Sequence, residues 1–102
     1  MKQSRAMRQT GRDVWRCWQM ETEGEGTAIL HTSVENGENP PVFYFSGDSF
    51  MIRSTPARTD TISGLHFRIE GDKSVRLQDQ GGLFNQFFLL PDKSTAVKNE
   101  NH

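Results

Sequence analysis

Apolar and polar residues alternate with a period of two between residues 65 and 70. The apolar residues are Leu65, Phe67 and Ile69, and the polar residues are His66, Arg68 and Glu70. The pattern returns between residues 74 and 78, where Val75 and Leu77 are the apolar positions. Such alternation is typical of a β-strand with one buried face, so the two segments predict a β-hairpin.

The register of this hairpin is set by the need to keep its apolar residues on one face, because a slip of one residue would expose them. A three-residue loop, residues 71–73, opposes Phe67 to Leu77, whereas a two-residue loop would mix the faces. The same register places Arg68 directly opposite Arg76. Like charges opposed across a sheet are mildly destabilising, and we expect Glu70, diagonal to Arg76, to compensate for them.

A second hairpin is predicted from Val42 to Arg53, because Gly47-Asp48 suits a two-residue turn. This turn opposes Phe45 to Phe50 and Tyr44 to Met51. One face is expected to form the core; it carries Phe43, Phe45, Phe50 and Ile52. The other face is also mostly apolar and needs a cover, either another strand layer, a terminal arm or a second copy of the chain. This second face is the predicted partner-binding surface, and its residues are Val42, Tyr44, Met51 and Arg53.

Three further segments, 13–21, 27–34 and 83–90, are predicted strands, and the polar stretch 55–63 is a predicted loop. Residues 87–90 are apolar at every position, which favours a central strand buried on both sides. The chain is therefore predicted to be all-β, with about seven short antiparallel strands in a meander that forms a small barrel or a two-layer sandwich.

The ends of the chain differ from its middle in composition. Residues 1–12 are polar and basic, and they predict a flexible N-terminal arm or a single helical turn. Residues 92–102 follow Pro91 and predict a disordered polar tail. A single all-β domain, residues 13–91, is expected between them. A meander that begins with a strand carrying Trp15 and Trp18 resembles small lipocalin-like barrels in architecture.

Charge is distributed unevenly along the 102 residues, although the formal net charge is only −1. Five basic residues and one acidic residue lie between positions 1 and 16, whereas positions 21–40 hold five glutamates and no basic residue. Two readings remain open: the segments attract each other within the fold, or the basic arm binds a partner. The near-zero net charge gives no global attraction to nucleic acid or to anionic lipid.

Few residues suggest chemistry. Cys17 is the single cysteine, and no apolar run resembles a signal peptide or a membrane span, so we expect a cytoplasmic protein that needs no membrane. His31 and His66 lie on different predicted strands and do not make up a zinc ligand set. The Ser46–Ser49 segment is explained as a turn. We therefore expect no catalytic residue, no metal and no cofactor.

His66, Arg68 and Arg76 form a possible anion-binding group on the second hairpin. The sequence favours a non-enzymatic interaction module that associates with itself as a homodimer, or else binds another protein. A carrier of a small apolar ligand is an alternative, with a pocket lined by Phe43, Phe45, Phe50, Phe67 and Trp18. A weak nucleic-acid or anion binder is another alternative, acting through Arg68, Arg76 and the N-terminal arm.

Overall fold

The computed structural model describes residues 2–24, 26–34, 37–38, 40–71, 73–79, 81–83 and 85–98. These residues form one helix and ten strands: α1 (Lys2–Trp15), β1 (Cys17–Glu23), β2 (Thr27–Val34), β3 (Gly37–Glu38), β4 (Val42–Ser46), β5 (Phe50–Ser54), β6 (Thr59–Ser63), β7 (Leu65–Ile69), β8 (Ser74–Asp79), β9 (Asn85–Leu89) and β10 (Thr95–Lys98).

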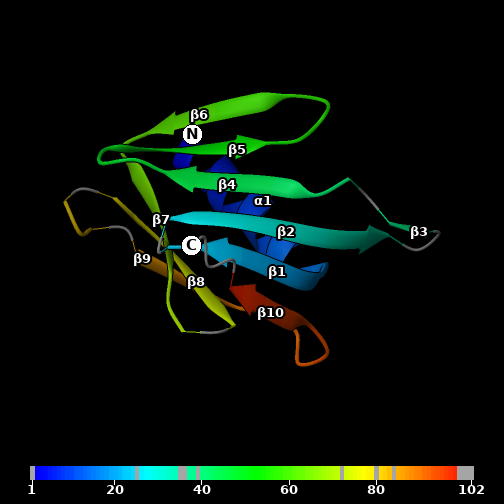
Figure 1. The fold of residues 1–102 in the computed structure, drawn as a ribbon. Coiled ribbons are helices and arrows are strands. Elements are labelled where there is room, and N and C mark those ends of the chain that lie inside the picture. Colours follow the sequence, from blue (N-terminus) through cyan, green and yellow to red (C-terminus); the bar gives the residue numbers. More distant parts are fainter. Residues whose placement is uncertain are drawn as a thin grey trace.

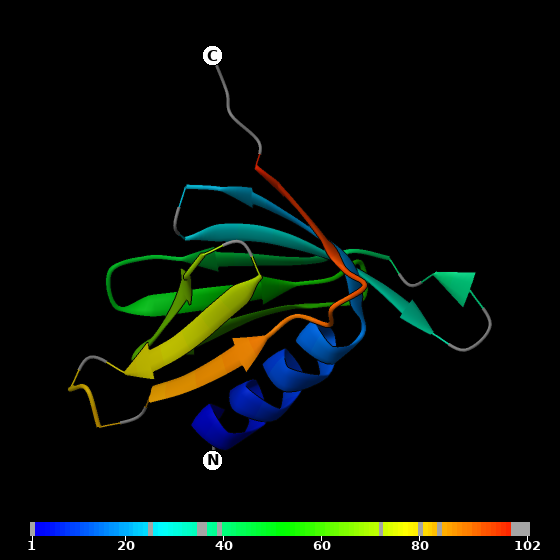
Figure 2. The same cartoon turned by 90° about the horizontal axis from the view of Figure 1, so that it is seen from below.

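The strands form two sheets that face each other (Figure 1). The large sheet has the order β10-β1-β2-β4-β5-β6, with β3 paired to β2, and the small sheet has the order β7-β8-β9. Helix α1 and the small sheet both lie against the same face of the large sheet (Figure 2). The predicted class, a β-protein folded as a two-layer sandwich, is confirmed. In the described part of the chain the strands do not close into a barrel.

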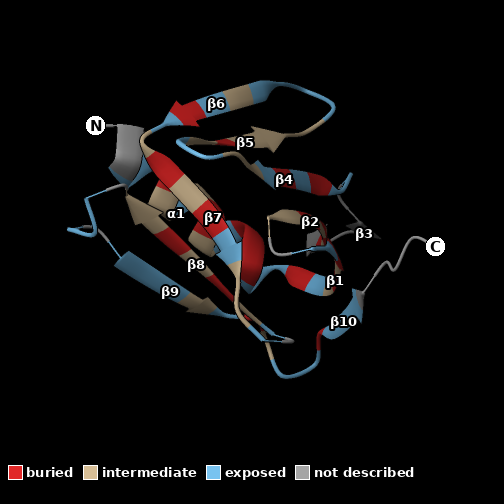
Figure 3. Cartoon of the chain, turned by 60° about the vertical axis from the view of Figure 1, so that its left-hand side comes forward, coloured by how far each residue is buried: buried red, intermediate tan, exposed pale blue. Residues whose placement is uncertain are grey.

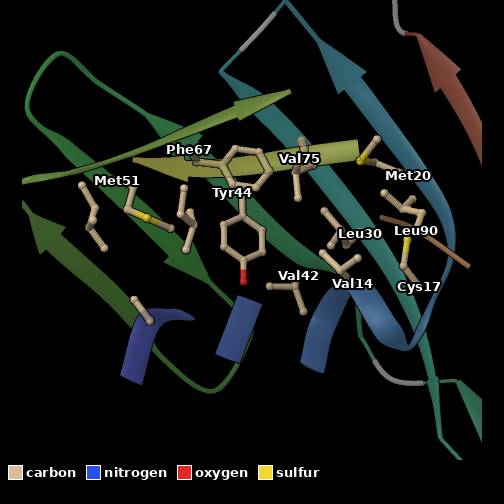
Figure 4. Close-up of a cluster of buried hydrophobic side chains, with 14 of the residues drawn as sticks. Val14, Cys17, Met20, Leu30, Val42, Tyr44, Met51, Phe67, Val75 and Leu90 are labelled. Carbon is tan, nitrogen blue, oxygen red and sulfur yellow. The ribbon is translucent and has the colours of Figure 1, made fainter. Parts of the chain in front are cut away.

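The core lies between these layers and is filled by side chains from both. The rings of Tyr44 and Phe67 stack at its centre, with their centroids 4.8 Å apart. Figure 4 shows the Phe67 ring next to the Tyr44 ring, and the Tyr44 hydroxyl directed towards α1. Met20, Leu30 and Met51 are also completely buried. A stacked aromatic pair removes much apolar surface from water, which compensates for the modest size of the chain.

The hairpin from Leu65 to Gln78 has the predicted register. Phe67 pairs with Leu77, and Arg68 pairs with Arg76. Alternating burial along β7 and β8 is visible in Figure 3. Asp72, in the predicted three-residue loop, lies outside the described residues.

The Val42–Arg53 hairpin departs from the prediction in two ways. Its register is shifted by two residues, since Phe45 pairs with Ile52 and Tyr44 with Arg53, and the Gly47 amide donates to the Phe50 carbonyl oxygen, which moves the turn from residues 47–48 to residues 48–49. The grouping of residues by face is right, but the faces are reversed: Tyr44 is buried and Phe45 is exposed. The buried face is covered by another strand layer and by the N-terminal segment, two of the three covers that the sequence left open.

Both ends of the chain also differ from the prediction. Residues 2–15 form a helix of fourteen residues instead of an arm, because Ala6, Thr10 and Val14 lie on one face of it and pack on the sheets. Gly11 allows close packing, since a Cβ atom there would lie 3.2 Å from the Phe88 ring. In the predicted tail, β10 pairs with β1 in parallel; the terminal residues 99–102 lie outside the described part.

Two other predictions about strands were wrong. The segment predicted as a loop contains β6, which completes the large sheet and buries Ile62. Strand β9 was expected to be central, but it lies at the edge of the small sheet. Its outer residues Phe87 and Leu89 are exposed (Figure 3).

Candidate functional site

Apolar side chains from three neighbouring strands lie on the outer face of the large sheet, which the helix and the small sheet leave uncovered. We call five side chains on it the outer-face cluster: Ile29, Phe43, Phe45, Phe50 and Ile52. Phe43 and Phe45 are each 38% exposed. The other three are half-buried by their neighbours in the sheet. Figure 1 views the sheet from this side, with α1 behind it.

Strand pairing arranges this face in rows that run across the sheet. One row consists of Glu23, Thr27, Phe45, Ile52 and Thr61, each the paired neighbour of the next. The next row is formed in the same way by Glu21, Ile29, Phe43, Ser54 and Thr59. Within these five strands a phenylalanine of β4 is therefore at the middle of each row and a glutamate of β1 is at one end, and Val97 of β10 continues the second row beyond Glu21. The centre of the face is apolar and uncharged.

The predicted partner-binding residues occupy the opposite face. Val42, Tyr44 and Met51 are buried in the core, where α1 and β7 cover them. The fourth, Arg53, is turned towards α1 and contacts Asp13. The structure thus brings the four residues together, as the sequence predicted, but they lie inside the molecule.

Asp13 is the centre of a buried polar cluster between α1 and the large sheet. Its carboxylate accepts a hydrogen bond of 2.6 Å from the Tyr44 hydroxyl and one of 2.8 Å from Nε of Arg53. Nη2 of Arg53 donates to the second carboxylate oxygen at 3.2 Å. The Tyr44 hydroxyl also lies 3.3 Å from the Thr10 hydroxyl. A buried carboxylate is tolerated only when it is paired and hydrogen-bonded in this way.

This environment changes the acidity of the groups around Asp13. Burial raises the pKa of Tyr44 far above its ordinary value, and the neighbouring Asp13 charge raises it further. The hydrogen bonds to Asp13 raise the pKa of Arg53 despite its partial burial. Tyr44 therefore stays neutral and Arg53 stays charged, so that Asp13 keeps a donor on both sides.

The predicted anion-binding group lies on the small sheet, and two of its residues are engaged by neighbours. All three guanidinium nitrogens of Arg76 donate hydrogen bonds, two to the Glu70 carboxylate at 2.9 Å and one to Asn85 at 2.6 Å. The pKa of Glu70 is lowered by the Arg76 guanidinium. His66 has its Nδ1 atom 3.2 Å from the Gly47 carbonyl oxygen. Glu70 therefore compensates for the opposed arginines, as expected, and three of the five guanidinium N–H donors of Arg76 are already used within the small sheet.

Cys17 and His31 lie on the adjacent strands β1 and β2, and each contacts other groups of the sheet. The Cys17 thiol is buried and donates to the Gln19 carbonyl oxygen at 3.2 Å. Burial raises its pKa to about 11, so that the reactive thiolate is suppressed at neutral pH. His31 pairs with Glu21 and lies 5.5 Å from the Trp18 ring. Across the described residues, no group of three His, Cys, Asp or Glu side chains is placed to hold a metal ion.

Two open cavities lie beside α1. The first, of about 270 Å³, is lined by Arg5, Ala6 and the β6 segment. The second, of about 350 Å³, lies near the C-terminal end of α1 and is lined by Arg12, Arg16 and Arg53, among others. Neither is lined by the residues that were predicted to line the pocket of a ligand carrier, Phe43, Phe45, Phe50, Phe67 and Trp18. Among the helical residues that the structure describes, no helix is long and apolar enough to cross a membrane.

Finding the outer-face cluster from the sequence would have required knowing which face of the Val42–Arg53 hairpin is buried. Both faces of that hairpin are apolar, so alternation alone does not distinguish them. Two of the arginines that line the second cavity, Arg12 and Arg16, belong to the basic N-terminal segment that is visible in the sequence. No protein-family model, no curated protein and no solved structure matches the chain.

Proposed function

We propose that this protein is a non-enzymatic interaction module that forms a homodimer through the outer face of its large sheet. The observation that carries this proposal is the outer-face cluster: apolar side chains remain exposed on one face of a sheet whose other face packs against α1 and β7–β9. Removing such apolar surface from water is the main favourable term in association.

A second copy of this chain suits the face better than an unrelated partner because of the way in which its charges are arranged. Glu21 and Glu23 lie on β1, at one end of each row, whereas β6 at the other end contributes threonines. A two-fold axis that runs along the strands above β4 places β1 of one copy over β6 of the other. The glutamates of the two copies then stay apart and face hydroxyl groups.

This two-fold axis places the middle residue of each row opposite the same residue of the second copy. Phe45 is at the centre of the row from Glu23 to Thr61, so it packs against Phe45 of the second copy. The surface is thus self-complementary, as a two-fold interface requires. Two sheets stacked in this way pack about 10 Å apart with nearly aligned strands.

Sedimentation of the wild-type protein and of two matched variants tests the proposal. The wild type is expected to be a dimer, and F45E a folded monomer, because the axis places two glutamates against each other in the apolar centre. L89E is the control: Leu89 is 70% exposed on β9, and this variant should remain a dimer. I52K, judged in the same way, replaces F45E if circular dichroism shows that F45E is unfolded.

Each contrary result has a definite meaning. A wild-type protein that remains monomeric at high concentration overturns self-association. Dissociation by L89E alone places the interface on β9 and overturns the choice of face. The axis is tested by the double variant E23C/T61C in a C17A background. A bis-maleimide reagent that spans the separation of about 10 Å between stacked sheets should link this variant into covalent dimers, whereas E23C alone should cross-link much less.

A further inference from the structure

Three arginines meet at the second cavity, where α1 ends against the large sheet. Arg12 lies in the last turn of α1, Arg16 follows the helix directly, and Arg53 comes from β5. All three line the same cavity of about 350 Å³. Arg12 and Arg16 are spaced by four residues, which places them on one side of the helical turn, and the Arg16 amide donates to the Arg12 carbonyl oxygen at 3.1 Å.

The acidic group in this cavity is already neutralised. Both carboxylate oxygens of Asp13 accept hydrogen bonds from Arg53, and one of them also accepts from Tyr44. The positive charge of Arg53 is thus neutralised by Asp13. The guanidinium groups of Arg12 and Arg16 have no hydrogen bond or ion pair to the side chains that the structure describes, so among the described lining residues two positive charges are not paired with a carboxylate.

The rest of the lining is suited to an organic group. Val42, Pro40, Pro56 and Ala57 supply apolar surface beside the arginines. Thr55 and Thr32 contribute hydroxyl groups to the same cavity. A concave site with an apolar wall and a few convergent polar groups is the usual form of a small-molecule site.

We propose that this cavity binds a small organic dianion, a compound with a phosphate monoester or two carboxylates attached to an apolar body. Two guanidinium groups match the two negative charges, and their planar forks suit phosphate or carboxylate oxygens. Val42 and the prolines contact the apolar body. The site is separate from the outer-face cluster, so that this inference does not depend on dimer formation.

The probes are phenyl phosphate and phenyl sulfate, which share one ring and differ in charge at pH 8. Binding is followed by titration calorimetry and by shifts of backbone amide resonances. Phenyl phosphate should bind, with shifts concentrated around Arg12, Arg16 and Thr55, and phenyl sulfate should bind at least several-fold more weakly. Inorganic phosphate, which lacks the ring, should also bind more weakly.

The variants R12Q/R16Q and R5Q/R8Q remove the same charge from the N-terminal segment, but only the first pair lines this cavity. R12Q/R16Q should weaken phenyl phosphate binding about tenfold or more, and R5Q/R8Q should change it less than about twofold. Equal weakening by both pairs would show diffuse attraction to a basic helix and overturn the site. Absence of binding to the wild type, or shifts mapped elsewhere, would overturn it as well.

Discussion

The Tyr44 hydroxyl donates a hydrogen bond of 2.6 Å to the carboxylate of Asp13, thirty-one residues earlier in the chain. This bond joins strand β4 to helix α1 inside the core. The Tyr44 ring stacks on Phe67 of the small sheet, so one side chain connects all three parts of the fold. Arg53 completes the cluster from the neighbouring strand.

Asp13→Asn should destabilise the protein strongly. The substitution removes the charge that partners Arg53 and replaces one acceptor oxygen with an amide donor. Breaking one side of a buried ion pair costs about 3–5 kcal/mol, and we expect a decrease of this size in the free energy of unfolding measured in urea. Asp60→Asn is the matched control, because Asp60 pairs with the exposed Arg58 and its loss should cost about 1 kcal/mol or less. Equal losses in the two variants would contradict a structural role for the buried cluster.

The same cluster explains why the helix was missed in the sequence. The buried side of α1 carries Ala6, Thr10, Asp13 and Val14, which are mostly small or polar. Hydrophobic periodicity therefore has almost nothing to detect. The arginines at positions 5, 8, 12 and 16 follow a helical spacing on the opposite side, and that charged stripe was the usable signal.

The two hairpins show when alternation is sufficient and when it is not. In β7 and β8, charged residues alternate with apolar ones, so a single register buries Phe67 and Leu77, and this register was predicted correctly. In β4 and β5 both faces are apolar, and the choice depends on which face α1 and the small sheet cover. That is a property of the tertiary structure. The residues predicted to bind a partner consequently lie on the buried side of these strands.

Stability should decrease in alkaline solution because two buried groups must remain protonated in the folded state. Burial raises the pKa of Cys17 from 9.0 to about 11 and raises that of Tyr44 as well. A group with a raised folded-state pKa contributes its full stabilisation below its unfolded pKa and loses it as the pH rises towards the folded value. For Cys17 the loss therefore occurs between about pH 9 and 11, with a slope of up to about 1.4 kcal/mol per pH unit.

Urea unfolding between pH 7 and pH 11 measures this dependence. Between about pH 9 and 10 the free energy of unfolding should decrease less steeply with pH in the variant C17A than in the wild type. Between pH 7 and 8 the thiol is protonated in both states, so the two proteins should show the same pH dependence there. Tyrosine ionisation in the unfolded chain adds a second contribution above about pH 10, and this contribution should remain in C17A. Identical slopes in the wild type and C17A would show that the thiol is not shielded from solvent.

A single glycine carries the chain from the large sheet to the small one. Strand β6 ends at Ser63 and β7 begins at Leu65, so Gly64 alone makes the connection. Its φ angle is +83°, in the region that L-residues with a side chain avoid. The Gly64 amide donates to the Ser49 carbonyl oxygen at 2.8 Å, which fixes the turn against the hairpin of β4 and β5.

Gly64→Ala should lower the free energy of unfolding by about 1–2 kcal/mol, the usual cost of a left-handed conformation for an L-residue. Gly81→Ala is the control, since Gly81 is not among the described glycines with positive φ and a Cβ atom there meets no neighbour within 4 Å. That variant should have nearly wild-type stability, with a small gain from the less flexible unfolded chain. The aromatic signals of Tyr44 and Phe67 report whether the two sheets keep their relative position. If Gly64→Ala were as stable as the wild type, the positive φ angle at the junction between the sheets would not contribute to the free energy of unfolding. The angle between the two sheets would then be set by core packing alone.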